Sequence, residues 1–238
     1  MGQDALGVMW QVLHARDEAG LLQAMRDAMA TIGCEQVLYG IEMRLPQVGV
    51  VQHITSGYPL PYQQLYHQRA FIARDPTVTH CQTRTDPLVW SEKIYVPANH
   101  EIMEESRHHG LGYGVSLPVH ESPRVVGMLS LARDQPFASE AEQQHAIQAG
   151  EVLAACVHMA SQRLIVPGIL EGKRPRLSPQ ESECFKLVAI GKSNWDIGQL
   201  LNISETTAAF HVKNVLKKFG VSTRMQAVAM GVALGMIS

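Results

Sequence analysis

The chain has 238 residues, of which 46% are hydrophobic and 18% charged, and its formal net charge is −2. This composition supports a sizeable core and excludes a disordered or fibrous protein. No apolar run approaches the ~20 residues of a membrane span, and acids stand near the N-terminus where a secretory signal would be basic and then apolar. We therefore expect a cytoplasmic protein without a membrane partner. Its length allows one long domain or two unequal ones, and we favour two.

Charge is divided unevenly along the chain. From Glu171 onward there are nine basic and five acidic residues, whereas the first 170 residues have 11 basic and 17 acidic ones. A basic C-terminal part favours a polyanionic partner for that part. The four cysteines are scattered without a CxxC pair, and the eleven histidines form no HExxH motif. We therefore expect reduced thiols without a disulfide, and neither a bound metal nor a cofactor.

Periodicity predicts an α+β first domain. Apolar residues at helical spacing from Met9 to Ile32, interrupted near Glu18–Gly20, predict two helices, and the run from Ser139 to Leu164 predicts a long closing helix. Segments rich in β-branched and aromatic residues predict strands at 34–43, 50–54, 114–119 and 125–132. The expected fold is an antiparallel sheet between helices, an α-β-α sandwich.

A connection is predicted at 166–175, because Val166–Arg176 contains two prolines, two glycines and a basic cluster. The resulting division is a first domain at 1–165, a linker at 166–175 and a second domain at 176–238. The second domain is predicted to be all α with four helices. The first of these begins at Ser178, with Pro179 at the first helical position and Glu181 completing a capping box.

Three more helices follow, at 193–201, 204–219 and 223–236, with Gly220 ending the third. The tight turn at Asn202–Ile203 between two of them is typical of a helix-turn-helix. One stripe of the 204–219 helix can face a polyanion, with lysines for phosphates and Lys213 and Asn214 for base edges, while the opposite side turns inward. A generic helical bundle with a solvated charged face is the alternative. The candidate DNA-binding residues are Lys192, Thr206, Thr207, Ala209, Phe210, Lys213, Asn214 and Lys217.

The motifs of this part resemble the C-terminal domain of LuxR-type transcriptional regulators. They are Leu177–Glu181, Gly191-Lys192, Asp196-Ile197, Ile203–Glu205, Thr207, Phe210–Val212, Asn214, Lys218 and Arg224–Val228. The resemblance implies that the 204–219 helix enters the major groove of double-stranded DNA, and that the last helix helps a homodimer to bind a partly palindromic site. Thr206 and Ala209 stand where the family often has basic residues, which should weaken DNA contact or change the preferred bases.

The first domain resembles the autoinducer-binding domain of the quorum-sensing members of that family, whose ligands are N-acyl homoserine lactones. The residues that carry this resemblance are Tyr58-Pro59, Tyr62, Tyr66, Asp75-Pro76, Trp90-Ser91 and Gly114–Pro118. An acyl chain needs an apolar pocket, and its amide and lactone need a few polar groups. Asp75 can accept from the amide N–H, Tyr58 can donate to the acyl carbonyl, and Tyr66, Trp90 and Ser130 can line the site. Taken singly, each of these residues also fits a role in the core or, for Asp75, as a helix cap.

Tyr62 is the main departure, because the acyl-lactone receptors usually have tryptophan there. The Tyr62 hydroxyl can also donate a hydrogen bond to the lactone carbonyl, but from a different position than the indole N–H of tryptophan. Either the pocket binds an acyl lactone with Tyr62 as the donor, or the protein is a solo receptor whose pocket binds another small signal. We favour the first. An enzyme is disfavoured because the first domain has no GxSxG, metal or phosphate-loop motif. A DNA-binding-deficient partner that silences related regulators through mixed dimers is a third hypothesis.

Overall fold

The computed structural model describes residues 3–237 of the chain. The chain forms two compact units, one of residues up to 43 with 52–166 and one of 44–51 with 167 onward. No helix in the described range combines the length and the apolar character that crossing a membrane requires.

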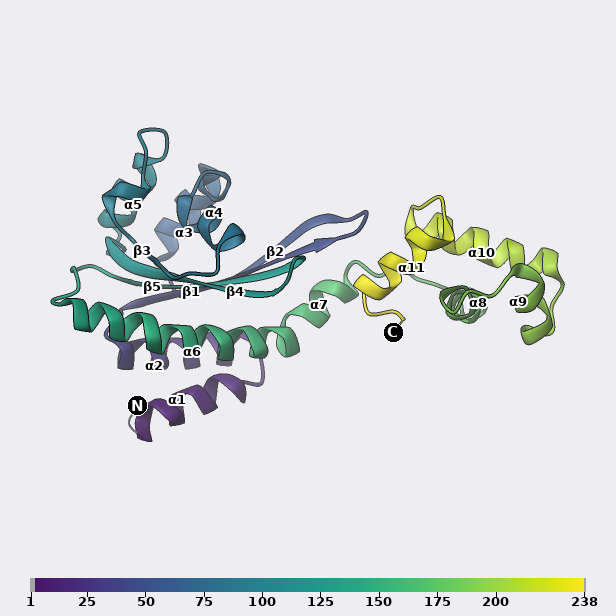
Figure 1. Cartoon of the computed structure of the whole chain (residues 1–238), viewed down its shortest axis with the longest axis horizontal. Helices are drawn as coiled ribbons and strands as arrows, with labels where there is room; N and C mark the ends of the chain where they lie inside the picture. The colour runs from purple at the N-terminus through teal and green to yellow at the C-terminus, as the bar shows by residue number, and fades with distance from the viewer. Residues whose placement is uncertain (1–2, 238) are drawn as a thin grey trace. The chain divides into compact units, whose positions relative to one another are not determined.

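The first unit is built on a five-stranded sheet with strand order β2-β1-β5-β4-β3 (Figure 1). Neighbouring strands run antiparallel along β1–β5, β5–β4 and β4–β3. The strands are β1 (Gln36–Leu45), β2 (Gly49–Ser56), β3 (Leu88–Val89), β4 (Tyr113–Ser122) and β5 (Val125–Arg133). The four predicted strands are confirmed; the short β3 has no period-two signal in the sequence.

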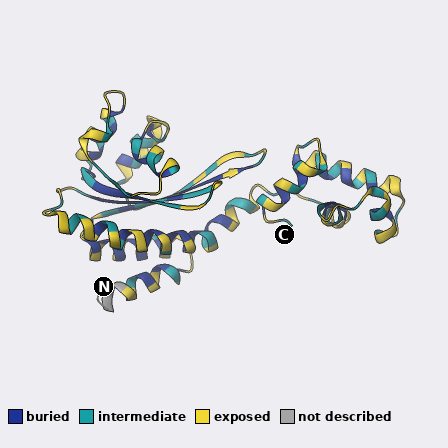
Figure 2. Cartoon of the chain, viewed as in Figure 1, coloured by how far each residue is buried: buried dark blue, intermediate teal, exposed yellow. Residues whose placement is uncertain are grey.

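Helices cover both faces of this sheet (Figure 1), which confirms the α-β-α sandwich. On one side of the sheet lie α2 (Glu18–Ile32) and α6 (Glu140–Leu164), and α1 (Gln3–Leu13) packs against these two helices on the side away from the sheet. On the other side lie α3 (Leu60–Gln68), α4 (Pro76–Thr83) and α5 (His100–His108), with short 3-10 turns at Phe71–Ala73 and Glu92–Ile94. Along α6 buried and exposed residues alternate by turns (Figure 2), as expected for a helix with one face on a core.

Helix caps explain where two of these helices begin. The interruption predicted near Glu18–Gly20 is misplaced by a few residues, because the Asp17 side chain accepts from the backbone N–H of Gly20 and starts α2 at Glu18. Ser139 caps α6 in the same way through the N–H of Glu142. The predicted linker is also more ordered than expected, since α7 occupies Val166–Glu171.

The second unit contains the four predicted helices, α8 (Pro179–Ala189), α9 (Asn194–Leu201), α10 (Glu205–Phe219) and α11 (Arg224–Ala233). Ser178 and Glu181 form the expected capping box, and Gly220 ends α10 in the left-handed conformation. Asn202 adopts the same left-handed conformation at φ 54° and makes the tight turn between α9 and α10. Only α11 differs, ending three residues before the predicted Met236.

A buried carboxylate joins α8 to α10. Glu181 Oε2 accepts from the backbone N–H of Ser178, which closes the capping box, and from Lys218 Nζ. The hydrogen bond from Lys218 is the main reason why the pKa of Glu181 lies below its usual range. Lys218 lies near the end of α10, where a lysine can contact phosphate, but its ammonium forms an ion pair with Glu181 of the same unit.

We expect Glu181→Gln to lower the free energy of unfolding by about 1–2 kcal/mol at pH 7, since it removes a cap and a charged partner. A lowered folded-state pKa stabilises the fold above the unfolded value of ~4.3, and this contribution is lost as the pH falls through the folded-state pKa. Urea unfolding at pH 7 and at about pH 3 should therefore show the difference between variant and wild type shrinking in acid.

Glu183→Gln is the control, because Glu183 pairs with Lys186 on the surface of the same helix. It should change the stability by less than about 0.5 kcal/mol. An equal loss for Glu181→Gln at both pH values would assign its effect to packing and not to charge.

Candidate functional site

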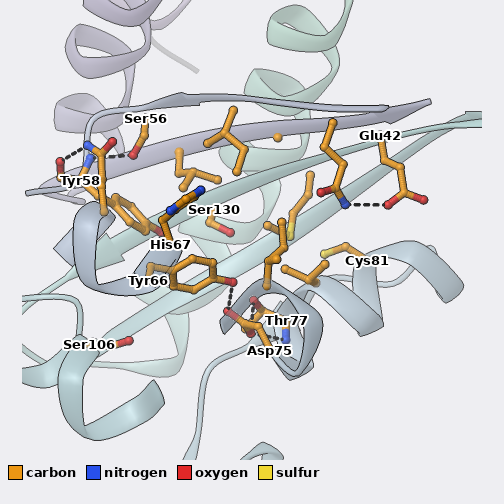
Figure 3. Close-up of a pocket in the computed structure, with 18 of the residues that line it drawn as sticks. Glu42, Ser56, Tyr58, Tyr66, His67, Asp75, Thr77, Cys81, Ser106 and Ser130 are labelled. Atoms are coloured by element: carbon orange, nitrogen blue, oxygen red, sulfur yellow. Dashed lines mark hydrogen bonds between the residues drawn. The ribbon is translucent and has the colours of Figure 1, made fainter. Parts of the chain in front are cut away.

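A cavity of about 550 Å³ lies in the first unit between the sheet and the helices α3, α4 and α5 (Figure 3). Its volume is within the range of ~300–1,000 Å³ found for small-molecule sites. Strand alternation places Leu38, Gly40, Ile54 and Met128 on the cavity, together with Val78 of α4. The six candidate ligand residues, Tyr58, Tyr62, Tyr66, Asp75, Trp90 and Ser130, all line it. The structure therefore brings together every side chain that the sequence suggested for the site.

Asp75 is buried at the N-terminus of α4 and has two roles at once. Its Oδ1 accepts from the backbone N–H of Thr77 at 2.8 Å and from Thr77 Oγ1 at 2.7 Å, which caps the helix. Its Oδ2 accepts from the Tyr66 hydroxyl at 2.8 Å, on the side that lines the cavity (Figure 3). Burial raises the pKa of Asp75, and the hydrogen bonds from Thr77 and Tyr66 oppose that shift. A carboxylate with several lone pairs thus stands in the wall of an otherwise largely apolar cavity.

Tyr58 presents an unused hydroxyl to the same space. Within residues 3–237, the buried Tyr58 Oη has no hydrogen bond of ordinary geometry, and the nearby Ser130 hydroxyl only partly opposes the effect of burial on its pKa. Its backbone carbonyl accepts from Gln63 Nε2 at 2.6 Å, which ties the segment before α3 to that helix. Burial raises the pKa of Tyr58 well above its usual value, so the hydroxyl keeps its proton and remains a donor. A buried donor without a partner is costly, and a bound acceptor would remove that cost.

Trp90 and Ser130 belong to one hydrogen-bonded chain across the sheet. Trp90 Nε1 donates to Ser116 Oγ at 2.9 Å, and Ser116 Oγ lies 2.9 Å from Ser130 Oγ. The Trp90 ring packs over Gly114, where an added Cβ would meet the ring at 3.1 Å and the Leu131 carbonyl at 2.3 Å. The glycine is needed here for the close approach of an aromatic ring to β4. Trp90 is therefore fixed as a wall of the cavity.

The Tyr62 hydroxyl is already committed within the protein. Ser106 Oγ donates to the backbone carbonyl of Ile102, so the hydrogen bond of 2.8 Å between Tyr62 Oη and Ser106 Oγ is donated by Tyr62. The expectation that Tyr62 replaces an indole N–H as a donor therefore requires that a ligand displace Ser106.

Several lining residues carried no signal in the sequence. Thr77, Cys81 and Ser106 reach the cavity from α4 and α5, and Glu42, Gln52 and Gln82 line another part of it. Thr77 could have been found from its place two residues after Asp75, because an aspartate side chain often accepts from the backbone N–H two residues on. The others depend on which strand or helix packs opposite, which local patterns do not reveal.

In the second unit α10 is amphipathic, as predicted. Its inward face consists of the buried Ala208, Val212, Val215 and Phe219. Of the candidate DNA-binding residues, Thr206, Thr207, Phe210, Lys213 and Lys217 are exposed, and Lys192, Ala209 and Asn214 are half-buried. Phe210 is 60% exposed, although a large apolar ring usually packs inward. Thr207 also takes part in the cap, because its backbone N–H donates to Ser204 Oγ.

Arg224, at the start of α11, binds the turn that connects α8 to α9. Its guanidinium donates to the backbone carbonyl of Lys192 at 2.9 Å and to Asn194 Oδ1. These bonds fix the turn between α8 and α9, and with it the base of the helix-turn-helix. The exposed stripe of α10 is thus held on a rigid support.

Comparison with known proteins agrees with both halves of this geometry. Residues 17–161 match the autoinducer binding domain, and residues 175–231 match the bacterial regulatory proteins of the luxR family. The chain belongs to the LuxR family. It is a LuxR-type quorum-sensing regulator with an autoinducer-binding domain and a helix-turn-helix DNA-binding domain, and not an enzyme.

Relatives extend along nearly the whole chain. The transcriptional activator protein SolR of Ralstonia solanacearum is 31% identical over 94% of this chain and 94% of its own length. The quorum-sensing regulator RhlR of Pseudomonas aeruginosa is 28% identical over 98% of this chain and 95% of its own. The crystal structure of Escherichia coli SdiA shares the fold, with a TM-score of 0.71 at 20% identity over 98% of this chain and 97% of SdiA.

Proposed function

We propose that this LuxR-family regulator binds an N-acyl homoserine lactone in the cavity of its first unit. It would then act in the cytoplasm as a homodimer that binds a partly palindromic site on double-stranded DNA through α10. Asp75 accepts from the amide N–H of the ligand, Tyr58 donates to its acyl carbonyl, and Tyr66, Trp90 and Ser130 line the head group. Lys192, Thr206, Thr207, Ala209, Phe210, Lys213, Asn214 and Lys217 form the DNA-binding surface.

The observation that carries the ligand proposal is the pairing of an acceptor and a donor in one apolar cavity. The buried Asp75 carboxylate faces the cavity, and the buried Tyr58 hydroxyl has no partner in the described part of the chain. A secondary amide offers one N–H donor and one carbonyl acceptor, which matches these two groups. An acyl chain fits the apolar part of the wall, which includes Leu38, Ile54 and Met128.

A different acyl signal is the second candidate, and Tyr62 is the observation that favours it. Its hydroxyl proton goes to Ser106, so a lactone carbonyl would meet no free donor from this ring unless the pair opens. A ligand whose head group donates a hydrogen bond can instead use the Tyr62 oxygen as an acceptor. SdiA has been solved in complex with octanoyl-rac-glycerol, an acyl ligand with a hydroxylated head.

Ligand binding would control DNA binding by shifting populations. A ligand that binds the folded, dimer-competent state and not the unfolded chain stabilises that state by mass action. We expect the lactone to raise the affinity for DNA, because dimers position two α10 helices on related half-sites. A ligand that lowered the affinity for DNA would contradict this expectation.

The ligand class can be tested by thermal unfolding of the purified protein with acyl homoserine lactones of varied chain length, with octanoyl glycerol and unrelated signals beside them. One subset of lactones should raise the melting temperature with the logarithm of concentration. A response to the glycerol ester alone would replace the lactone by the second candidate. No response to any acyl compound would reject the proposed ligand class.

Asp75→Asn should weaken lactone binding about tenfold or more, since a hydrogen bond to a charged group contributes ~1.5–3 kcal/mol. The asparagine keeps an oxygen for the Thr77 cap, so the variant should fold. Its NH₂ group opposes the ligand amide if it faces the cavity. Isothermal titration calorimetry measures the loss, and Asp86→Asn is the control, because Asp86 is exposed and pairs with Arg84. Unchanged affinity in Asp75→Asn would remove Asp75 from the site.

Lys213→Ala should lower the affinity for DNA about tenfold, because one base contact contributes ~1–3 kcal/mol. The probe is a duplex that the wild-type protein selects from a random-sequence pool, and fluorescence anisotropy measures binding. Lys186→Ala serves as the control, since Lys186 lies on α8 and pairs with Glu183. Equal affinities of the two variants for the duplex would show that Lys213 does not belong to the DNA-binding surface. A wild-type protein that selects no duplex would favour the silencing partner.

A further inference from the structure

A second polar group lines the cavity apart from Asp75. Glu42 Oε2 accepts from Gln52 Nε2 at 2.9 Å and from Gln82 Nε2 at 2.7 Å. We call these three residues the Glu42 cluster. They come from β1, β2 and α4, so their hydrogen bonds bridge the sheet and the helix above it. Figure 3 shows Glu42 and Tyr58 at opposite ends of the side chains drawn, with Asp75 and Tyr66 between the two ends.

The position of Glu42 in its strand is unusual. Residues 38, 40 and 42 alternate toward the cavity along β1, and the first two are leucine and glycine. Glu42 is nonetheless only 8% exposed. A charged residue is rarely buried unless it is paired, and the amides of Gln52 and Gln82 are two of the partners of Glu42. The cavity wall therefore ends in a carboxylate where an acyl-binding wall would be apolar throughout.

The cluster offers acceptors to the cavity. A carboxylate only accepts hydrogen bonds, and each glutamine turns its NH₂ group toward Glu42, which leaves its carbonyl oxygen as a further acceptor. An alkyl chain that reached this end would displace water from these oxygens without replacing its hydrogen bonds. A chain that ends in a hydrogen-bond donor would replace them.

We propose that the natural ligand carries a hydroxyl group at the far end of its acyl chain, and that the Glu42 cluster accepts a hydrogen bond from it. This inference rests on the proposed function, in which Asp75 and Tyr58 hold the amide away from the Glu42 cluster. Asp75 and the Glu42 cluster would then set the ligand length between them. Glu42 and Gln82 become the residues that determine chain-end specificity.

The test compares matched ligands that differ only at the chain end. Octanoyl and 8-hydroxyoctanoyl homoserine lactone form one pair, with shorter and longer pairs beside them, and the corresponding glycerol esters form a second series. Calorimetry on the full-length protein gives affinities for wild type, Glu42→Leu and Gln82→Leu. Gln82→Leu keeps the test valid if Glu42→Leu fails to fold, because Gln82 lies on α4 and is only half-buried.

For the best chain length, the wild type should prefer the hydroxylated ligand about tenfold, the effect of one hydrogen bond to a charged group. Both variants should lose that preference while binding the unsubstituted ligand at least as well. The proposal is overturned if the wild type prefers the alkyl end at every length, or if the preference persists in both variants.

Failure of the proposed function would look different. A hydroxyl preference seen only among the glycerol esters would keep the chain-end assignment and reject the lactone head group. Binding of unsubstituted and hydroxylated lactones with equal affinity would keep the function and reject the chain-end assignment. Binding by neither series would reject both.

Discussion

The burial of the Asp75 carboxylate is the constraint on which the rest of the first unit depends. A carboxylate remains in an apolar wall only when donors surround it, and here Thr77 supplies two and Tyr66 one. The same contacts start α4, fix Tyr66 from α3 and aim an acceptor into the cavity. One carboxylate therefore serves two places: Oδ1 caps the helix, and Oδ2 is a polar atom in the wall of the cavity. The Tyr58 hydroxyl, for which the described residues supply no hydrogen bond, lines the same cavity.

Local chemistry made much of the fold predictable. Ser178 with Glu181, Ser139 and Gly220 are capping signals whose effect stays within one turn of their helix, and each lies where the sequence placed it. Helices α3, α4 and α5 could not be predicted from such signals. They are short, α3 and α4 begin beside prolines, and they are held by packing against the sheet rather than by their own periodicity.

The site divides in the same way. The aromatic residues and Asp75 could be named from the sequence through their resemblance to a known family, yet the partners that lie far away in the sequence could not. Ser106 binds Tyr62 from 44 residues away, and Ser116 binds Trp90 from 26. The pairing of Lys218 with Glu181 likewise depends on how α8 and α10 pack. Such contacts decide which donors remain for a ligand or for DNA, and only the tertiary structure reveals them.

A crystal structure of the protein grown with the acyl homoserine lactone that stabilises it most is the most direct test of the central claim. The account predicts the ligand inside the cavity, with its amide nitrogen about 3 Å from an Asp75 oxygen and its acyl carbonyl about 3 Å from Tyr58 Oη. A lactone bound elsewhere, or bound in the cavity with its amide turned away from Asp75, would contradict the account.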